Sequence, residues 1–376
     1  MDGLAPGRAA LVGISHLRRV QAPGALQTTV VPVWRDGVRL VNRAPAVLLA
    51  VWLMTLIVSL PLTFVMRGTI AAHLGSSLAA DDAARGIDFG WMEEFRSQPA
   101  DLAASLKPSV IGFGAVLDNL NAFVDDQRRP AILAATTGAY LLLWLFAAGG
   151  IIDRYARDRP IGAAGFFGVS GVFLIRFLRL GVVMAVVYGV LFRSVHPWLF
   201  DVVYPRLTRD VDSERVAFIV RLGFYLIFGL ALGTANLAFD YAKVRAVMED
   251  RRSMIGALRA SLGFLARHWW PAISLYLIDA LLFAAVLAVY AIVAPGAGPA
   301  GWTMWPGVVV SQLYIVARLW VKLVFWSSEV CLLQSRLAHA GYSGHRRAAP
   351  SESPVVERLT GGSEVRQWTD SPSMQR

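Results

Sequence analysis

Three ionisable residues follow one another along a single apolar stretch near the end of the chain. Arg318, Lys322 and Glu329 lie at intervals of four and seven residues within residues 307–333. A helix with 3.6 residues per turn places all three on about one face. Asp279 lies in the preceding apolar stretch, at a depth that permits contact with them. Ionisable side chains at such a depth usually face a bundle interior, a water-filled path or each other, so these four residues form a candidate intramembrane polar cluster.

Two interpretations of this cluster stay open. In the first, Asp279 neutralises Lys322 or Arg318 and pins two helices together. The polar neighbours expected beside that pair are Gln312, Tyr314 and Tyr276. In the second, the excess of cations over nearby acids binds an anionic substrate or a lipid headgroup, or the cluster relays protons.

The chain has no short motif for another kind of chemistry. A Walker-type glycine loop, HExxH, a paired CxxC and a GxSxG elbow are all absent. The six histidines lack metal-ligand spacing, and the single cysteine, Cys331, excludes an intramolecular disulfide. We therefore expect no catalytic residue, no cofactor and no metal site, and a protein that is not an enzyme.

Six long apolar segments must position the cluster. The chain of 376 residues is 56% hydrophobic and 16% charged, with a mean hydropathy of +0.52, which a soluble domain of this length does not tolerate. A helix needs about 20 apolar residues to cross ~30 Å of hydrocarbon. The segments that meet this requirement are 46–66, 131–152, 173–192, 216–239, 272–294 and 307–333. They predict an all-α fold, a polytopic transmembrane helical bundle of about six spans within residues 34–338.

The placement of arginine and lysine predicts the orientation. With the N-terminus inside, the connections assigned to the cytoplasm hold roughly twice as many basic residues as those assigned outside. We expect a multi-pass protein of the bacterial inner (plasma) membrane with both termini in the cytoplasm. This topology accounts for the formal net charge of +10, so we expect membrane lipids and no nucleic acid as partners, with protein partners unknown.

Residues 67–130 are too long for a simple connection. They predict a small helical extracytoplasmic cap, in which residues 111–126 form an amphipathic helix. The cap either covers the bundle or offers a ligand or partner surface. The two terminal segments, 1–33 and 339–376, are polar and predict a disordered cytoplasmic N-terminus and tail.

A second long connection, the cytoplasmic loop 240–270, is basic, and Ser253 can cap a helix in it. The apolar stripe expected on that helix consists of Met254, Leu258, Leu262, Leu265 and Trp269. The arginines that border the stripe are Arg251, Arg252, Arg259 and Arg267. They are candidate contacts to inner-leaflet lipid, and docking of a cytoplasmic partner is the alternative. In the fourth span, Gly229 and Gly233 form a small-xxx-small pair that permits close helix packing.

Several stretches carry a resemblance to known proteins. They are FDYAKVRAVMEDRRS at 239–253, HLGSS at 73–77, IGFGAVLDNL at 111–120 and ARLWVKLVFW at 317–326. With these, residues 34–337 resemble a group of uncharacterised bacterial six-helix integral membrane proteins. The hairpin pattern is more distantly similar to the membrane domain of some glycerophosphodiester phosphodiesterases, without their catalytic domain. The resemblance implies an architecture and no activity.

Two functions follow as expectations. The first is a non-enzymatic membrane-organising or accessory subunit that contacts lipids or partners. The alternative is a transporter or permease for a lipid or an anionic small molecule, which uses the region of Asp279, Arg318 and Lys322. A cavity lined by those residues favours transport, and a dry, tightly packed bundle favours the accessory role.

Overall fold

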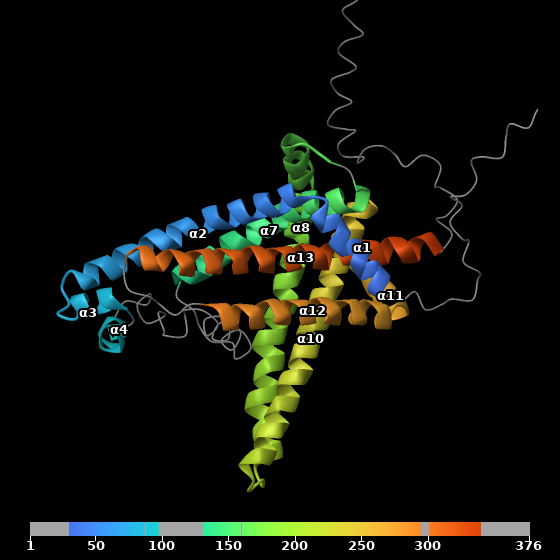
Figure 1. The fold of residues 1–376 in the computed structure, drawn as a ribbon. Helices are drawn as coiled ribbons and strands as arrows, with labels where there is room; N and C mark the ends of the chain where they lie inside the picture. The colour runs from blue at the N-terminus through green and yellow to red at the C-terminus, as the bar shows by residue number, and fades with distance from the viewer. Residues whose placement is uncertain (1–29, 87, 98–130, 159, 295–300, 340–376) are drawn as a thin grey trace, which may run out of the picture.

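The computed structural model describes residues 30–339 except 87, 98–130, 159 and 295–300 (Figure 1). In this part of the chain every regular element is a helix, so the predicted all-α class is confirmed. The first elements are α1 (Val30–Asn42), α2 (Pro45–Leu74), α3 (Ala80–Arg85), α4 (Phe89–Arg96), α7 (Ala131–Arg157) and α8 (Ala163–Val190). The later ones are α10 (Glu214–Met248), α11 (Met254–Arg267), α12 (Trp269–Val293) and α13 (Trp305–His339).

Within the described residues, six helices are long and apolar enough to cross a membrane, as the sequence predicts. They are Pro45–Leu74, Ile132–Arg157, Ala163–Thr208, Glu214–Met248, Trp269–Val293 and Trp305–Leu337. Each covers its expected apolar segment to within one residue and extends beyond it at one end or both. The added turns at the ends are richer in polar residues, because intrahelical hydrogen bonds satisfy the backbone on both sides of the hydrocarbon boundary.

The third span is one long helix with two irregular parts. After α8 the chain continues through the π-helical turns η2 (Leu191–Val195) and η3 (Trp198–Val203) into α9 (Tyr204–Thr208). Pro197 lies between the two π-turns, where a residue without a backbone N–H interrupts the regular hydrogen-bond ladder. An aromatic cluster around Phe224 and Phe228 of α10 packs against this part and holds α8 and α10 together as a hairpin.

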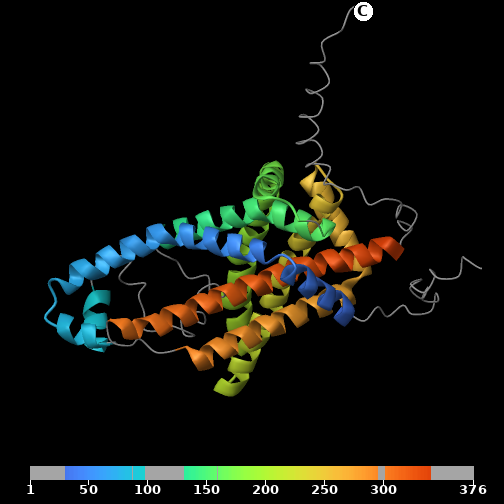
Figure 2. The ribbon, with the colours of Figure 1, turned by 45° about the horizontal axis from the view of Figure 1, so that its top comes forward.

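The spans fall into two groups. Helices α2, α7, α12 and α13 run alongside one another, and the α8–α10 hairpin crosses their direction (Figures 1 and 2). The main buried core lies where the groups meet, and it joins the C-terminal parts of α7, α10 and α13 to the N-terminal parts of α2, α8 and α12. We call this the core end of the bundle. Away from it the spans expose large apolar side chains, as expected of helices that face lipid.

Close backbone contacts hold the core end together. Gly149 and Gly150 of α7 face α8, where an added Cβ would lie 2.8 Å from Phe173 and 2.6 Å from the Ser170 hydroxyl. Gly37 of α1 has the same role against α13, with Ser328 backbone atoms 2.8 Å from the position of an added Cβ. Helix α1 therefore belongs to the bundle core and is not a mere leader to the first span.

The predicted cap is present in the part of residues 67–130 that the structure describes. Trp91, Met92 and Phe95 of α4 are buried against Ile70 and Leu74 near the end of α2. Asp88 caps α4 by accepting a hydrogen bond from the backbone N–H of Trp91. The amphipathic helix expected at residues 111–126 lies outside the described residues, as do residues 1–29 and 340–376 of the two termini.

Candidate functional site

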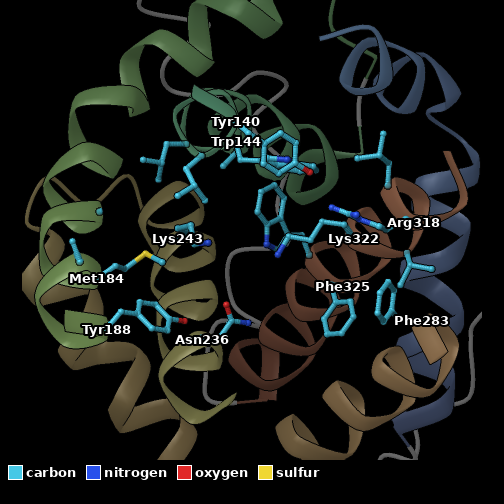
Figure 3. Close-up of a pocket in the computed structure, with 18 of the residues that line it drawn as sticks. Tyr140, Trp144, Met184, Tyr188, Asn236, Lys243, Phe283, Arg318, Lys322 and Phe325 are labelled. Carbon is cyan, nitrogen blue, oxygen red and sulfur yellow. The ribbon is translucent and has the colours of Figure 1, made fainter. Parts of the chain in front are cut away.

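A cavity of about 770 Å³ lies between α7, α8, α10 and α13, beside the core end. Its walls are mainly aliphatic and aromatic, with Trp144 from α7, Met184 from α8 and Phe325 from α13 (Figure 3). Leu141 belongs to the wall and is 57% exposed, so the cavity is not sealed within the protein. Its volume falls in the range of about 300–1,000 Å³ typical of small-molecule sites.

The cavity is lined by cations and, among the described residues, by no carboxylate. Arg318 and Lys322 extend from α13, and Lys243 approaches from α10 on the other side (Figure 3). Arg318 and Lys322 are one helical turn apart, so their head groups reach the same region. Charges in a poorly hydrated space interact much more strongly than charges in water. The arrangement therefore favours a negative group placed near these side chains.

Lys243 is fixed by a buried acid behind the cavity wall. Its Nζ lies 2.5 Å from Oδ1 of Asp240, which is one turn earlier on α10 and only 1% exposed. The same carboxylate accepts hydrogen bonds from Asn236 Nδ2 at 3.1 Å and from Trp326 Nε1 at 3.3 Å. Asp240 thus accepts hydrogen bonds from three donors, and its negative charge mainly neutralises Lys243.

Lys322 differs because an aromatic ring, not a carboxylate, is its close partner. Its Nζ lies 5.1 Å from the centroid of the Trp326 ring, and Lys243 Nζ lies 5.3 Å from the same ring. Trp144 packs edge-on against Trp326 with ring centroids 5.3 Å apart. Among the described residues, neither Lys322 nor Arg318 has a carboxylate within ion-pair distance, and the nearest acids that act on Lys322 are the buried Asp240 and Glu329. Cation–π contact leaves the positive charge available to a ligand.

Asp279 is not the partner of Lys322 or Arg318 that the sequence predicts. It is 1% exposed, and its carboxylate accepts hydrogen bonds from Trp34 Nε1 at 2.9 Å and Ser328 Oγ at 3.0 Å. The prediction fails because α1 inserts Trp34 between α12 and α13, and sequence spacing could not place α1 there.

The expected polar neighbours do not gather around one ion pair, although Tyr314 does lie beside Arg318. Gln312 accepts a hydrogen bond from Trp52 Nε1 at 3.1 Å. Tyr314 stacks on Tyr290 with ring centroids 4.2 Å apart, and Tyr276 packs edge-on against Phe325 at 5.4 Å. The candidate cluster is therefore divided between cations on the cavity wall and acids in the core.

Glu329 is the least compensated acid of the cluster. It is 3% exposed, and within the described part of the chain neither carboxylate oxygen has a hydrogen-bond partner. Its charged neighbours are Lys322, Lys243, Asp240 and Asp279. It does not line the cavity, but it lies behind the cations that do.

Lys243 is a site residue that the sequence did not predict. It falls within the predicted basic loop 240–270, whereas α10 continues to Met248 and buries Lys243 to 7% exposure. The available signal was the spacing of Asp240 and Lys243, since residues three apart on a helix are neighbours. The structure also shows no group of metal-ligating side chains among the described residues.

The four arginines of the predicted lipid contact do not act together. The Arg251 side chain is turned back onto Glu249 and the carbonyl oxygen of Gly256. Arg252, Arg259 and Arg267 are exposed. Three of the four residues thus remain available for an external contact.

A scan against protein-family models, a search of the curated proteins and a search of the solved structures found no match to this chain. The six candidate spans are those of a multi-pass helical membrane protein, and the cation-lined cavity lies between four of them. The resemblance to bacterial six-helix membrane proteins stays a prediction.

Proposed function

We propose that this membrane protein binds an anionic amphiphile, such as an anionic lipid, in the cavity between α7, α8, α10 and α13. The observation that carries the proposal is a largely apolar space with Arg318, Lys322 and Lys243 on its wall and, among the described residues, no acid. The apolar walls suit an acyl chain, and the cations suit a phosphate or carboxylate head.

The arrangement of charges supports an anion rather than a cation as the ligand. Asp240 neutralises Lys243, but Lys322 faces the Trp326 ring and Arg318 is exposed. Arginine and lysine at membrane depth are costly unless they contact a counter-charge or water. The head group of an anionic lipid would supply that counter-charge. The head group of a zwitterionic lipid also carries a phosphate, but it brings its own positive charge into the cavity.

The proposed setting is the bacterial inner membrane with the core end toward the cytoplasm. An even number of spans places the described ends of the chain on one side, and the basic residues concentrate in the segments at that side. The positive-inside rule assigns such a side to the cytoplasm.

Two roles are consistent with binding of this ligand. The cavity favours a transporter or permease for a lipid or anionic small molecule, since it contains two of the three residues expected on such a path. The tight packing of α1 against α13 at Gly37 favours a non-enzymatic membrane-organising or accessory subunit that holds a lipid in place. Movement of a labelled anionic lipid between the leaflets of proteoliposomes supports the first role, and binding without movement supports the second.

Binding is tested by native mass spectrometry of the purified full-length chain titrated with phosphatidylglycerol or phosphatidylcholine. The double variant Arg318→Gln/Lys322→Gln is expected to weaken phosphatidylglycerol binding about tenfold or more, since contacts to charged groups contribute ~1.5–3 kcal/mol each. The matched control is Arg179→Gln/Arg221→Gln, which removes two exposed arginines from spans without touching the cavity. Equal losses in the two double variants, or equal affinity for the two lipids, would contradict the proposal.

A further inference from the structure

Helix α11 presents an outward face on which arginines and large apolar side chains alternate. The residues of this face are Ile255, Arg259, Leu262 and Arg267 of α11, together with Arg252 just before the helix and Trp270 in the first turn of α12, and all six are exposed. Ile255, Arg259 and Leu262 follow one another at intervals of four and three residues, the spacing of one helix face. Ile255 is 73% exposed, Leu262 50% and Trp270 76%, so the face offers a group of large apolar side chains to its surroundings.

The opposite face of α11 is fixed to the bundle. Met254, Ala257, Phe264 and Leu265 are buried, and the Ser261 hydroxyl donates a hydrogen bond to the carbonyl oxygen of Ala238 at 2.9 Å. The apolar stripe that the sequence predicts is thus largely turned into the protein, with Leu262 as its exposed member. Helix α11 therefore has two apolar surfaces. One packs into the bundle, and this packing fixes the orientation of the outward face.

The charge of the outward face is of one sign. Residues 250–270 contain no acidic residue after Asp250, and Arg251 is withdrawn by its contact with Glu249. Three arginines thus border Ile255, Leu262 and Trp270 without a neighbouring carboxylate on the same helix. Long arginine side chains lie along apolar surface and extend their guanidinium groups outward, so both kinds of side chain can meet a headgroup layer together.

The position of α11 beside a membrane span favours lipid as the partner of its outward face. The helix ends at Arg267, and the apolar span α12 begins at Trp269, so α11 lies level with the end of a membrane span. The exposed ring of Trp270 also begins an apolar face of α12 that continues through Leu277 and Leu281, which are 55% and 70% exposed. Tryptophan at the end of a span is typical of the membrane–water interface.

We propose that the outward face of α11 lies on the anionic lipid headgroups of the leaflet at the core end. Ile255, Leu262 and Trp270 enter the boundary of the acyl region, and Arg252, Arg259 and Arg267 contact lipid phosphates. The surface is separate from the cavity, because none of its residues lines it. The inference therefore stands whether or not the cavity binds a ligand.

The test places a spin label on the outward face of the full-length chain in lipid nanodiscs. The background variant Cys331→Ala removes the single native thiol, and Ile255→Cys introduces the labelled one. In nanodiscs that contain phosphatidylglycerol, the label at 255 is expected to be accessible to oxygen and protected from a water-soluble nickel complex. A label introduced by Leu78→Cys, which is fully exposed beside the cap, is the matched control and should stay accessible to nickel.

The arginines are tested in the same system. Replacing Arg252, Arg259 and Arg267 with glutamine should raise the nickel accessibility of the label at 255 several-fold toward the level at position 78. Nickel accessibility that is already equal at the two positions in phosphatidylglycerol would overturn the proposal. Protection in native membrane vesicles but not in nanodiscs would point instead to an acidic protein partner and would also overturn it.

A second measurement avoids the cysteine replacements. Brominated phosphatidylglycerol should quench more tryptophan fluorescence in the unmodified chain than in Trp270→Phe, because the ring at 270 contacts the acyl boundary. Trp91→Phe is the control, since Trp91 is buried in the cap against Ile70 and Leu74. No change in quenching between the unmodified chain and Trp270→Phe would contradict the proposed contact.

Discussion

The indole Nε1 of Trp34 donates a hydrogen bond to Oδ1 of Asp279 at 2.9 Å, across 245 residues of sequence. Ser328 of α13 donates to the other oxygen of the same carboxylate. One buried acid therefore joins α1, α12 and α13 at the core end. Because buried carboxylates are costly without donors, the bundle depends on the presence of α1 beside these two spans.

Replacing Trp34 with phenylalanine keeps an aromatic ring but removes the donor. We expect Trp34→Phe to lower the free energy of unfolding in detergent by about 1–3 kcal/mol, the cost of leaving a buried acceptor unsatisfied. Trp320→Phe removes a comparable bond, at 2.9 Å to Asn42, from a more exposed site and should cost less. If both substitutions lower the free energy of unfolding equally, the hydrogen bond to Asp279 stabilises the bundle no more than the exposed bond to Asn42 does.

Asp279→Asn tests the same junction from the acceptor side. Trp34 and Ser328 donate to different oxygens of Asp279, and an amide keeps an acceptor at only one of these two positions, with an NH₂ donor at the other. We expect lower thermal stability and faster proteolysis of the purified chain. Unchanged folding and protease resistance would count against the junction.

The close approach of α1 to α13 predicts a difference between two glycines. Gly37→Ala places a Cβ 2.8 Å from Ser328 backbone atoms and should destabilise the bundle by about 1–3 kcal/mol. Gly229→Ala meets no atom within 4 Å and should be neutral, or stabilising by ~0.5–1 kcal/mol through helix propensity. Thermal unfolding of both variants in one detergent gives the comparison, and similar losses of stability would contradict the packing described.

The two glycines also show how far the sequence could predict the fold. The six spans were predictable because hydrocarbon imposes a length and composition on each segment separately. Gly229 and Gly233 matched a close-packing pattern, yet the structure leaves open space beside both, and Gly37, Gly149 and Gly150 form the close contacts instead. Which face of a helix meets a neighbour depends on the arrangement of all six spans, and a local pattern does not contain that information.

The buried pair of Asp240 and Lys243 predicts strong coupling. Asp240→Ala leaves a cation beside the Trp326 ring without its carboxylate, and we expect a loss of about 3–5 kcal/mol in stability. Lys243→Met should also lower the stability, because it leaves the buried Asp240 carboxylate without its cation. The double variant should lose less than the sum of the two single losses, because neither charge is then left unpaired. Additive losses in a double-mutant cycle would contradict a direct interaction.

The orientation predicts the behaviour of reporter fusions. With both ends in the cytoplasm, a fluorescent protein fused after Arg376 should fluoresce, and alkaline phosphatase at that place should be inactive. Alkaline phosphatase inserted after Gly75, between α2 and α3, should be active. The opposite pattern at the two positions would overturn the proposed orientation.

The site was only partly predictable for a related reason. Arg318 and Lys322 were identified because charges inside an apolar segment are conspicuous, and both line the cavity. The predicted partner of Asp279 was wrong because Trp34 comes from α1, which precedes the first predicted span and is too short and too charged for hydropathy to detect. Lys243 was missed because hydropathy ends a span where charges begin, whereas α10 continues through them into the core.

The central claim is that the cavity holds an anionic amphiphile. The most direct measurement is a single-particle cryo-electron microscopy structure of the full-length chain in nanodiscs with equal amounts of phosphatidylglycerol and phosphatidylcholine. We expect an acyl chain between α8 and α13, with the lipid phosphate within hydrogen-bonding distance of Lys322 and Arg318. A cavity that contains only water, or a lipid whose headgroup lies away from both cations, would contradict it.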